Sequence, residues 1–130
     1  MNSLINAGLF FVATSAVVIL SIFLFNLVTR YDVWREINKG NLAVAFSTGG
    51  IVLGVSNIMR FAITTNDKLA PTVMWGSIGT LVLLAVYFAF EILTPKLNVN
   101  EEIGKGNKAV GFISFIFSIG FSYIIGASIS

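Results

Sequence analysis

The stretch "EINKGNLAVAF" (36–46) occurs a second time, in closely similar form, in this chain of 130 residues. It returns as "EEIGKGNKAVGF" (101–112), and a long apolar run follows it in both places. At an offset of 66 positions the two copies share identical residues: Glu36, Ile37, Lys39, Gly40, Asn41, Ala43, Val44 and Phe46 fall on Glu102, Ile103, Lys105, Gly106, Asn107, Ala109, Val110 and Phe112. A polar phrase that recurs before an apolar run indicates a repeated structural unit.

The composition points to a membrane. The chain is 56% hydrophobic and 11% charged, with a mean hydropathy of +0.91, which is too apolar for an ordinary soluble domain of this size. A helix that spans a bilayer needs about 20 mostly apolar residues. Four runs are close to that length: 5–28, 42–59, 73–90 and 109–130. The sequence therefore predicts an all-α integral membrane protein with four transmembrane helices.

The similarity between the two halves extends beyond the polar phrase. Nearer the N-terminus the offset becomes 65, and "NLVTR" (26–30) aligns with "EILTP" (91–95). The pattern predicts a tandem duplication of a helix–loop–helix unit, with repeats at 1–66 and 67–130. A unit of two spans returns the chain to its starting side, so the two repeats are expected to have the same orientation in the membrane.

Loop charges predict the orientation. Six of the eight Lys and Arg residues lie in or beside the loops at 29–40 and 95–108. Cytoplasmic loops carry an excess of basic residues, so both loops are expected in the cytoplasm and both termini outside. Membrane topology also explains the basic residues without a nucleic-acid partner.

Several chemistries are excluded by residue type. The chain has no cysteine and no histidine, which rules out disulfides, Cys or His metal sites and histidine acid–base catalysis. The segment "GKGNK" (104–108) lacks the spacing of a phosphate-binding loop. We therefore expect no enzymatic activity, no cofactor and no metal.

The doubled motif, with each copy between two hydrophobic spans, resembles the YjfL/YshE-like family of small bacterial inner-membrane proteins, which is catalogued as a domain of unknown function. The resemblance covers nearly the whole chain. It implies four spans and a bacterial inner membrane, and it brings no activity or catalytic residue. The family opens each loop with a Thr-Pro-like turn. Thr94–Pro95 fits that turn, whereas Thr29–Arg30 departs from it.

The repeated phrase has two interpretations. Asn41 can cap the following helix, Gly40 permits a sharp turn, and Lys39 can reach lipid phosphates. Alternatively, the two helix N-termini attract an anion. The repetition of Glu36 favours the second interpretation, because capping alone needs no glutamate. The candidate binding residues at this face are Glu36, Lys39, Gly40, Asn41, Glu102, Lys105, Gly106 and Asn107.

The first loop contains a second candidate surface. In "YDVWREI" (31–37), Val33, Trp34 and Ile37 fall on one side. This pattern is typical of a short helix that lies among lipid headgroups with Trp34 as its anchor. The alternative that this helix binds a partner protein is not excluded by the sequence.

Polar residues inside the spans are functional candidates, because ionisable groups there are costly. Glu91 aligns with Asn26 at the same depth, and Tyr87 lies one turn away. Glu91 either reaches the headgroups and pairs with Lys96, or forms a proton or cation site between the repeats. Arg60 is expected to extend to the outer surface.

Small residues in two spans predict close helix packing. The positions are Gly50 and Gly54 in one span and Ser114, Ser118, Ser122 and Gly126 in another. They serve either packing within the four-helix unit or contacts between subunits.

Two functions remain. The first is an oligomeric membrane scaffold that recruits a cytosolic or membrane protein at its two basic loops, in envelope stress for example. The alternative is a small oligomeric ion channel or transporter with a site near Glu91 and Asn26. Both predict association of several copies within the lipid bilayer.

Overall fold

The computed structural model describes residues 2–130 of the chain and contains helices and turns throughout that range, without a β-strand. The helices are α1 (Asn2–Val28), α2 (Val33–Asn38), α3 (Leu42–Thr65), α4 (Leu69–Leu93), the 3₁₀ helix η1 (Pro95–Leu97), α5 (Val99–Gly104) and α6 (Lys108–Ile129). The four long helices are each long and apolar enough to cross a membrane, which confirms the predicted all-α membrane class.

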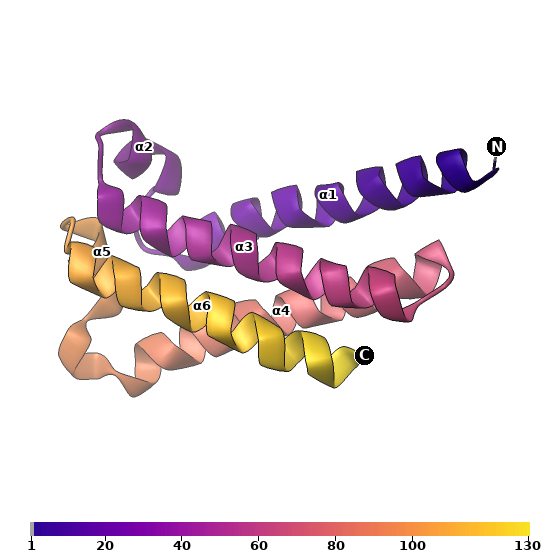
Figure 1. Ribbon diagram of the computed structural model, residues 1–130. Helices are drawn as coiled ribbons and strands as arrows, with labels where there is room; N and C mark the ends of the chain where they lie inside the picture. The colour runs from indigo at the N-terminus through magenta and orange to yellow at the C-terminus, as the bar shows by residue number, and fades with distance from the viewer. Residues whose placement is uncertain (1) are drawn as a thin grey trace.

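The four long helices alternate in direction, as Figure 1 shows. The short helices α2 and α5 lie together at one end, and both termini lie at the other end with the α3–α4 turn. Large apolar side chains remain exposed along the sides, such as Phe11 and Leu81. In water such a surface would aggregate, but in a bilayer it faces lipid.

Three spanning helices are longer than the apolar runs that predicted them, α3 and α4 more so than α1. The run 42–59 lies within Leu42–Thr65, and the run 73–90 lies within Leu69–Leu93. The extensions are stabilised by side chains that bond to their own helix. Thr65 donates to the carbonyl of Phe61 at 2.9 Å, and Thr72 donates to that of Lys68 at 2.8 Å. Hydropathy reports the lipid-facing length, whereas these helices continue beyond it.

The centre of the bundle is the contact between α3 and α6, the most extensive in the fold. Glycine permits this close approach. A methyl group on Gly50 would lie 2.8 Å from the Cα of Phe115, and one on Gly111 would lie 2.7 Å from the Cα of Ala43. Gly54 meets the backbone of Ser118 in the same way. Helices in lipid associate through such close backbone packing.

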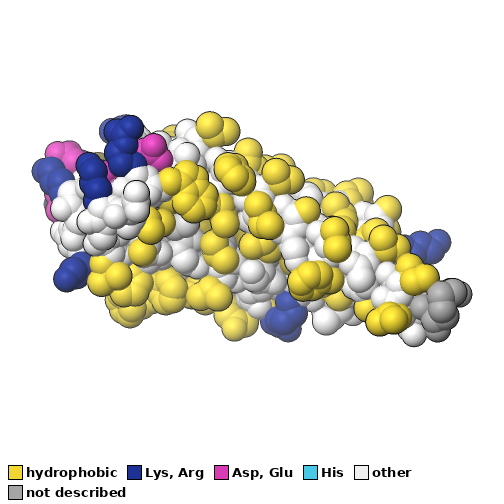
Figure 2. Space-filling view, turned by 90° about the horizontal axis from the view of Figure 1, so that it is seen from above, with side chains coloured by type: hydrophobic (Ala, Val, Ile, Leu, Met, Phe, Trp, Pro, Cys, Tyr) yellow, Lys and Arg dark blue, Asp and Glu magenta, His cyan; other side chains and the backbone are white. Residues whose placement is uncertain are grey.

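Most charged side chains gather at the end that carries α2 and α5, and apolar side chains cover the sides, as Figure 2 shows. Each half of the chain contains a long helix, a short helix and a second long helix. The second half also contains η1. The duplication of one unit, with its boundary at 66–67, stays a prediction from the sequence.

Candidate functional site

The repeated phrase forms a corner between a short helix and a spanning helix. In the first copy the N–H of Gly40 bonds to the carbonyl of Ile37, and the N–H of Asn41 bonds to that of Glu36, both at 2.9 Å. These two bonds define a Schellman motif, whose glycine adopts a positive φ. Gly40 has a φ of 87° and Gly106, in the second copy, has a φ of 91°. Each asparagine then caps the next spanning helix.

The glutamate of the phrase bonds to the capping asparagine. The amide of Asn41 donates to Glu36 at 3.0 Å, and that of Asn107 donates to Glu102 at 2.8 Å. Glu36 also lies 3.6 Å from the ammonium of Lys39. The glutamate therefore has a structural role in the corner. A carboxylate thus lies beside each helix N-terminus, and an anion site at this face stays a prediction from the sequence.

The second corner carries one further ion pair. Lys105 lies 3.0 Å from Glu101 and 3.9 Å from Glu102. Its bond to Glu101 raises the pKa of the Lys105 ammonium above the ordinary value. The pair is well exposed on both sides, so it contributes little to stability.

Asn41 also connects the two halves of the chain. Its amide donates to the carbonyl oxygens of Ile103 at 3.0 Å and Gly104 at 3.1 Å, at the end of α5. Its side-chain oxygen accepts the N–H of Val44 at 3.2 Å. One side chain thus caps α3, bonds to Glu36 and holds α5 against α3.

Asn26 and Glu91, which the sequence aligns, each contact the short helix of their own half. The side-chain oxygen of Asn26 accepts the N–H of Val33 at 2.9 Å, at the start of α2. Glu91 accepts a hydrogen bond from the side chain of Asn100 in α5. Glu91 is half-buried, and its hydrogen-bond partner is Asn100 rather than Lys96.

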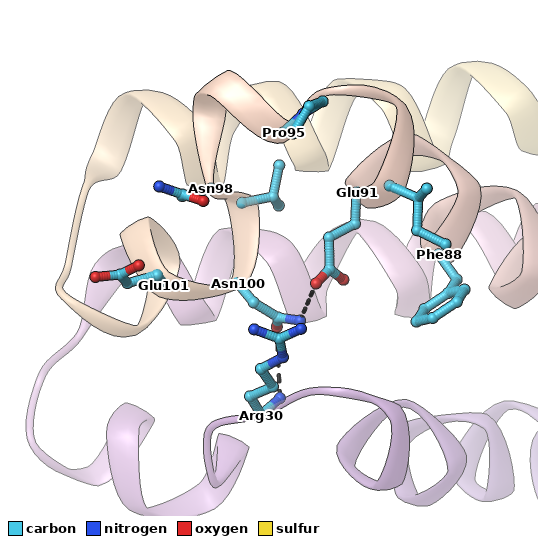
Figure 3. Close-up of a pocket in the computed structure, with 9 residues that line it drawn as sticks. Arg30, Phe88, Glu91, Pro95, Asn98, Asn100 and Glu101 are labelled. Atoms are coloured by element: carbon cyan, nitrogen blue, oxygen red, sulfur yellow. Dashed lines mark hydrogen bonds between the residues drawn. The ribbon is translucent and has the colours of Figure 1, made fainter.

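Asn100 joins three segments. Its amide group donates to Glu91 in α4, and its oxygen accepts the backbone N–H of Arg30, in the link between α1 and α2, at 3.5 Å. Figure 3 shows the two bonds of Asn100, one to the carboxylate of Glu91 and one to the backbone of Arg30. These three residues line a pocket of about 210 Å³ with Phe88, Asn98 and other residues of α4 and α5. Asn26 does not line this pocket, so the two aligned polar residues serve separate contacts.

Tyr87 belongs to a buried group of hydroxyls. Its oxygen lies 2.7 Å from that of Ser47 in α3. The hydroxyl of Tyr31, in the α1–α2 link, is also buried but has no hydrogen-bond partner among the described residues. Burial raises the pKa of Tyr31, because ionisation would place a charge away from water.

Arg60 lies at the opposite end of the bundle. Its guanidinium donates to the side chain of Asn57 at 3.0 and 3.2 Å and lies over the ring of Phe61. Asn57 in turn donates to Ser122 at 3.0 Å. The Arg60 side chain is exposed, as a residue that reaches the outer surface should be.

The predicted packing residues lie within the bundle. Gly50, Gly54, Ser114, Ser118, Ser122 and Gly126 are all buried. Gly126 meets the ring of Phe61 in α3. Within the chain, these residues serve the contact between α3 and α6.

The short helix predicted in the first loop is α2. Asp32 caps it by accepting the N–H of Arg35, Val33 is fully buried, and Trp34 packs against Phe23. About half of the Trp34 surface stays exposed, as an interfacial anchor requires.

Sequence reasoning missed Asn100 and Gly111. One signal for Asn100 was present: at the offset of 66 it aligns with Trp34, so the copies differ there as they differ at Asn26 and Glu91. The two differences are linked, because the Asn100 amide donates a hydrogen bond to the Glu91 carboxylate. Gly111 carried no local signal, because only the position of α3 makes it a close contact.

Four spanning helices with an organised polar end define a small polytopic α-helical membrane protein. The chain belongs to the family described as Domain of Unknown Function (DUF350), which matches residues 1–129. It is similar to the UPF0719 transmembrane protein YshE of Bacillus subtilis (strain 168), with 41% identity over 98% of this chain and 96% of that protein. It is also similar to the UPF0719 inner membrane protein YjfL of Escherichia coli (strain K12), with 25% identity over 85% and 83% of the two chains. No solved structure matches.

Proposed function

We propose that this protein is a membrane-embedded scaffold that binds a partner protein at the end of the bundle carrying α2 and α5, and that it is not an enzyme. The observation that carries the proposal is the hydrogen bonding between halves at this end. Asn41 bonds to the end of α5, and Asn100 bonds to the link between α1 and α2. A surface held in place before binding loses little conformational freedom when a partner docks.

The charge distribution supports the same surface. Exposed side chains of both signs lie there, including Lys39, Glu101 and Lys105. Mixed charges of this kind select a partner by complementarity and guide its approach. We infer that this end faces the cytoplasm and that the termini lie outside. The basic loops support this orientation, and the name of the Escherichia coli relative, an inner membrane protein, supports a bacterial inner membrane.

We also expect several copies to associate. The weak packing of α1 supports this expectation. Only Thr14, Ser21 and Phe25 are buried among its described side chains. A spanning helix with so little contact inside its own protomer has most of its surface available to lipid or to a second copy.

Photo-crosslinking in living cells tests the scaffold. A photoreactive amino acid replaces Arg35 or Lys96, which are exposed at the polar end, or Leu53, which is exposed on α3. We expect one discrete adduct from Arg35 and from Lys96, with the same protein identified by mass spectrometry in both. Leu53 should give no such adduct, and Lys105→Glu should reduce it. Equal adducts at all three sites, or none, would contradict a specific docking surface.

The alternative is a small oligomeric channel or transporter. The buried hydroxyls of Thr48, Ser114 and Ser118 favour it, since they have no hydrogen-bond partner among the described residues. The backbone contact between α3 and α6 argues against a path through one protomer. Purified protein in liposomes with an internal pH-sensitive dye should therefore produce no proton flux. A proton flux that is lost in the Glu91→Gln variant would favour the channel or transporter over the scaffold.

A further inference from the structure

Two neighbouring hollows lie between α1 and α4, and the pocket around Glu91 lies next to them. The first hollow, of about 240 Å³, lies between the middle of α1 and Ser77. The second hollow, of about 420 Å³, shares Leu24 and Leu81 with the first. Phe88 lines both this second hollow and the Glu91 pocket. The three cavities are therefore neighbours in a row, and the two between α1 and α4 are called the α1–α4 groove here, with the polar pocket beside its end.

The groove between α1 and α4 is apolar. Its wall consists mainly of leucine side chains, with Ala85 and Phe88. The hydroxyls of Ser21 and Thr80 donate to the carbonyls of Val18 and Gly76 in their own helices, so neither offers a free donor to a ligand. Such a groove favours a hydrocarbon chain over a polar molecule.

The length of the groove matches one leaflet of a bilayer. Along α4, from Ser77 to Phe88, the rise is about 16 Å at about 1.5 Å per residue. The hydrocarbon core of a bilayer is about 30 Å thick, so one leaflet contributes about half of that. The polar pocket lies at the end of the bundle where the charged side chains gather, which is the level of the headgroups.

The polar pocket offers one positive and one negative group. Within the described chain, no carboxylate lies within 4.0 Å of the Arg30 guanidinium. No Lys or Arg nitrogen of the described residues lies within 4.0 Å of the Glu91 carboxylate. Asn100 donates to one oxygen of Glu91, and the other oxygen has no hydrogen bond among residues 2–130. Glu101 also lines the pocket, but its carboxylate pairs with Lys105. The arrangement is complementary to a zwitterion.

We propose that this site binds one phospholipid with a primary-amine headgroup, of the phosphatidylethanolamine type. One acyl chain lies in the α1–α4 groove, the phosphate bonds to Arg30, and the ammonium bonds to the free oxygen of Glu91. Charge-assisted hydrogen bonds of this kind are the strong ones. An anionic lipid without the amine would leave Glu91 beside added negative charge. This proposal does not rest on the scaffold, because it follows from the pocket and the α1–α4 groove alone, although the pocket shares Asn100 and Glu101 with the end proposed to dock a partner.

Native mass spectrometry of the delipidated protein in detergent tests the headgroup. Dioleoyl phosphatidylethanolamine and dioleoyl phosphatidylglycerol are titrated separately. We expect one phosphatidylethanolamine per protomer, bound about tenfold more tightly than phosphatidylglycerol, which is the scale of one charged hydrogen bond. Glu91→Gln should abolish the preference, since it keeps an acceptor for Asn100 and loses the charge. Arg30→Gln should weaken both lipids.

A second pair of variants tests the groove. Ala85 lines it, whereas Ala127 is an exposed alanine on α6, a helix without substantial contact to α1. Ala85→Phe should lower the affinity for phosphatidylethanolamine about tenfold, and Ala127→Phe should leave it unchanged. If Ala85→Phe is not monodisperse on size exclusion, Ala85→Leu replaces it with the same expected direction. Equal affinity for both lipids in the parent, or equal effects of the two alanine variants, would overturn the proposal.

Discussion

The side chain of Asn41 donates a hydrogen bond to the backbone carbonyl of Ile103, 62 positions later in the chain, at 3.0 Å. The aligned amide of Asn107 donates to Glu102 of its own corner and to no carbonyl of the first half among the described residues. The two copies of the motif are alike in sequence and in local turn, yet only one of them connects the halves.

This asymmetry predicts different effects of the same substitution. Asn41→Asp and Asn107→Asp both keep a capping oxygen, and both place a carboxylate beside a glutamate. Only Asn41→Asp also loses the donor to α5 and turns a carboxylate toward two carbonyl oxygens. We expect Asn41→Asp to be less stable than Asn107→Asp by about 1–3 kcal/mol. Thermal unfolding of the detergent-purified variants measures the difference, and equal losses would show that the bonds to α5 are not stabilising.

Adjacent glycines in α3 give a matched test of the helix crossing. A methyl group on Gly50 would lie 2.8 Å from the Cα of Phe115, whereas one on Gly49 meets nothing within 4 Å. Gly50→Ala should lower the free energy of unfolding by about 1–3 kcal/mol, because backbone must move. Gly49→Ala should be neutral or slightly stabilising, because alanine favours helix over glycine. Unfolding in detergent, followed by circular dichroism, checks both. Similar destabilisation by both would place the crossing elsewhere.

The bond between Glu91 and Asn100 predicts coupling between these residues. Glu91→Ala and Asn100→Ala should each destabilise the protein, and the double variant should lose less than the sum. The expected coupling is about 1.5–3 kcal/mol, the range for a hydrogen bond to a charged group. Glu91→Ala combined with Asn98→Ser, a neighbour in the same pocket wall, serves as the control cycle and should be nearly additive. Additivity in the first cycle would contradict the bond.

Two tyrosines with buried hydroxyls should respond differently to loss of the hydroxyl. Tyr87→Phe removes the bond to Ser47 and should cost about 1 kcal/mol. Tyr31→Phe removes a buried hydroxyl without a partner, so it should be neutral or stabilising. Thermal unfolding of the two variants at neutral pH checks the order, and a larger loss for Tyr31→Phe would show that its hydroxyl has a partner in the membrane.

The raised pKa of Tyr31 adds a dependence on pH. In the unfolded chain the phenol ionises near pH 10, whereas in the folded protein it stays neutral to higher pH. Its contribution is therefore complete below pH 10 and is lost as the pH rises above it. The fall in unfolding temperature between pH 9 and 11 should be smaller in Tyr31→Phe than in the parent. An identical fall would show that Tyr31 is not buried.

Single cysteines test the inferred orientation, since the chain has no natural cysteine. Ser3→Cys and Ser130→Cys should react with an impermeant thiol reagent in intact cells, whereas Asn38→Cys and Lys96→Cys should react only after lysis. Mass shift on a gel reports the labelling. Reaction at the loop positions alone would reverse the orientation, and reaction at one terminus alone would contradict an even number of spans.

The sequence by itself determined the spans and the corners. Apolar length decides what crosses a bilayer, and the bonds that form each Lys-Gly-Asn corner join residues at most five positions apart, so short-range pattern is sufficient. The duplication and the orientation are also inferences of this kind and stay predictions. The sequence did not predict the ends of α3 and α4, because these helices continue past the apolar run that hydropathy detects.

The tertiary structure decided which distant groups meet. That Gly111 meets α3, that Asn100 and not Lys96 reaches Glu91, and that Asn41 bonds to α5 all depend on the rotation and crossing of helices. In a soluble helix the polar face would indicate that rotation. A spanning helix is apolar on nearly every side, so its rotation follows from close packing between backbones, which residue type alone does not specify.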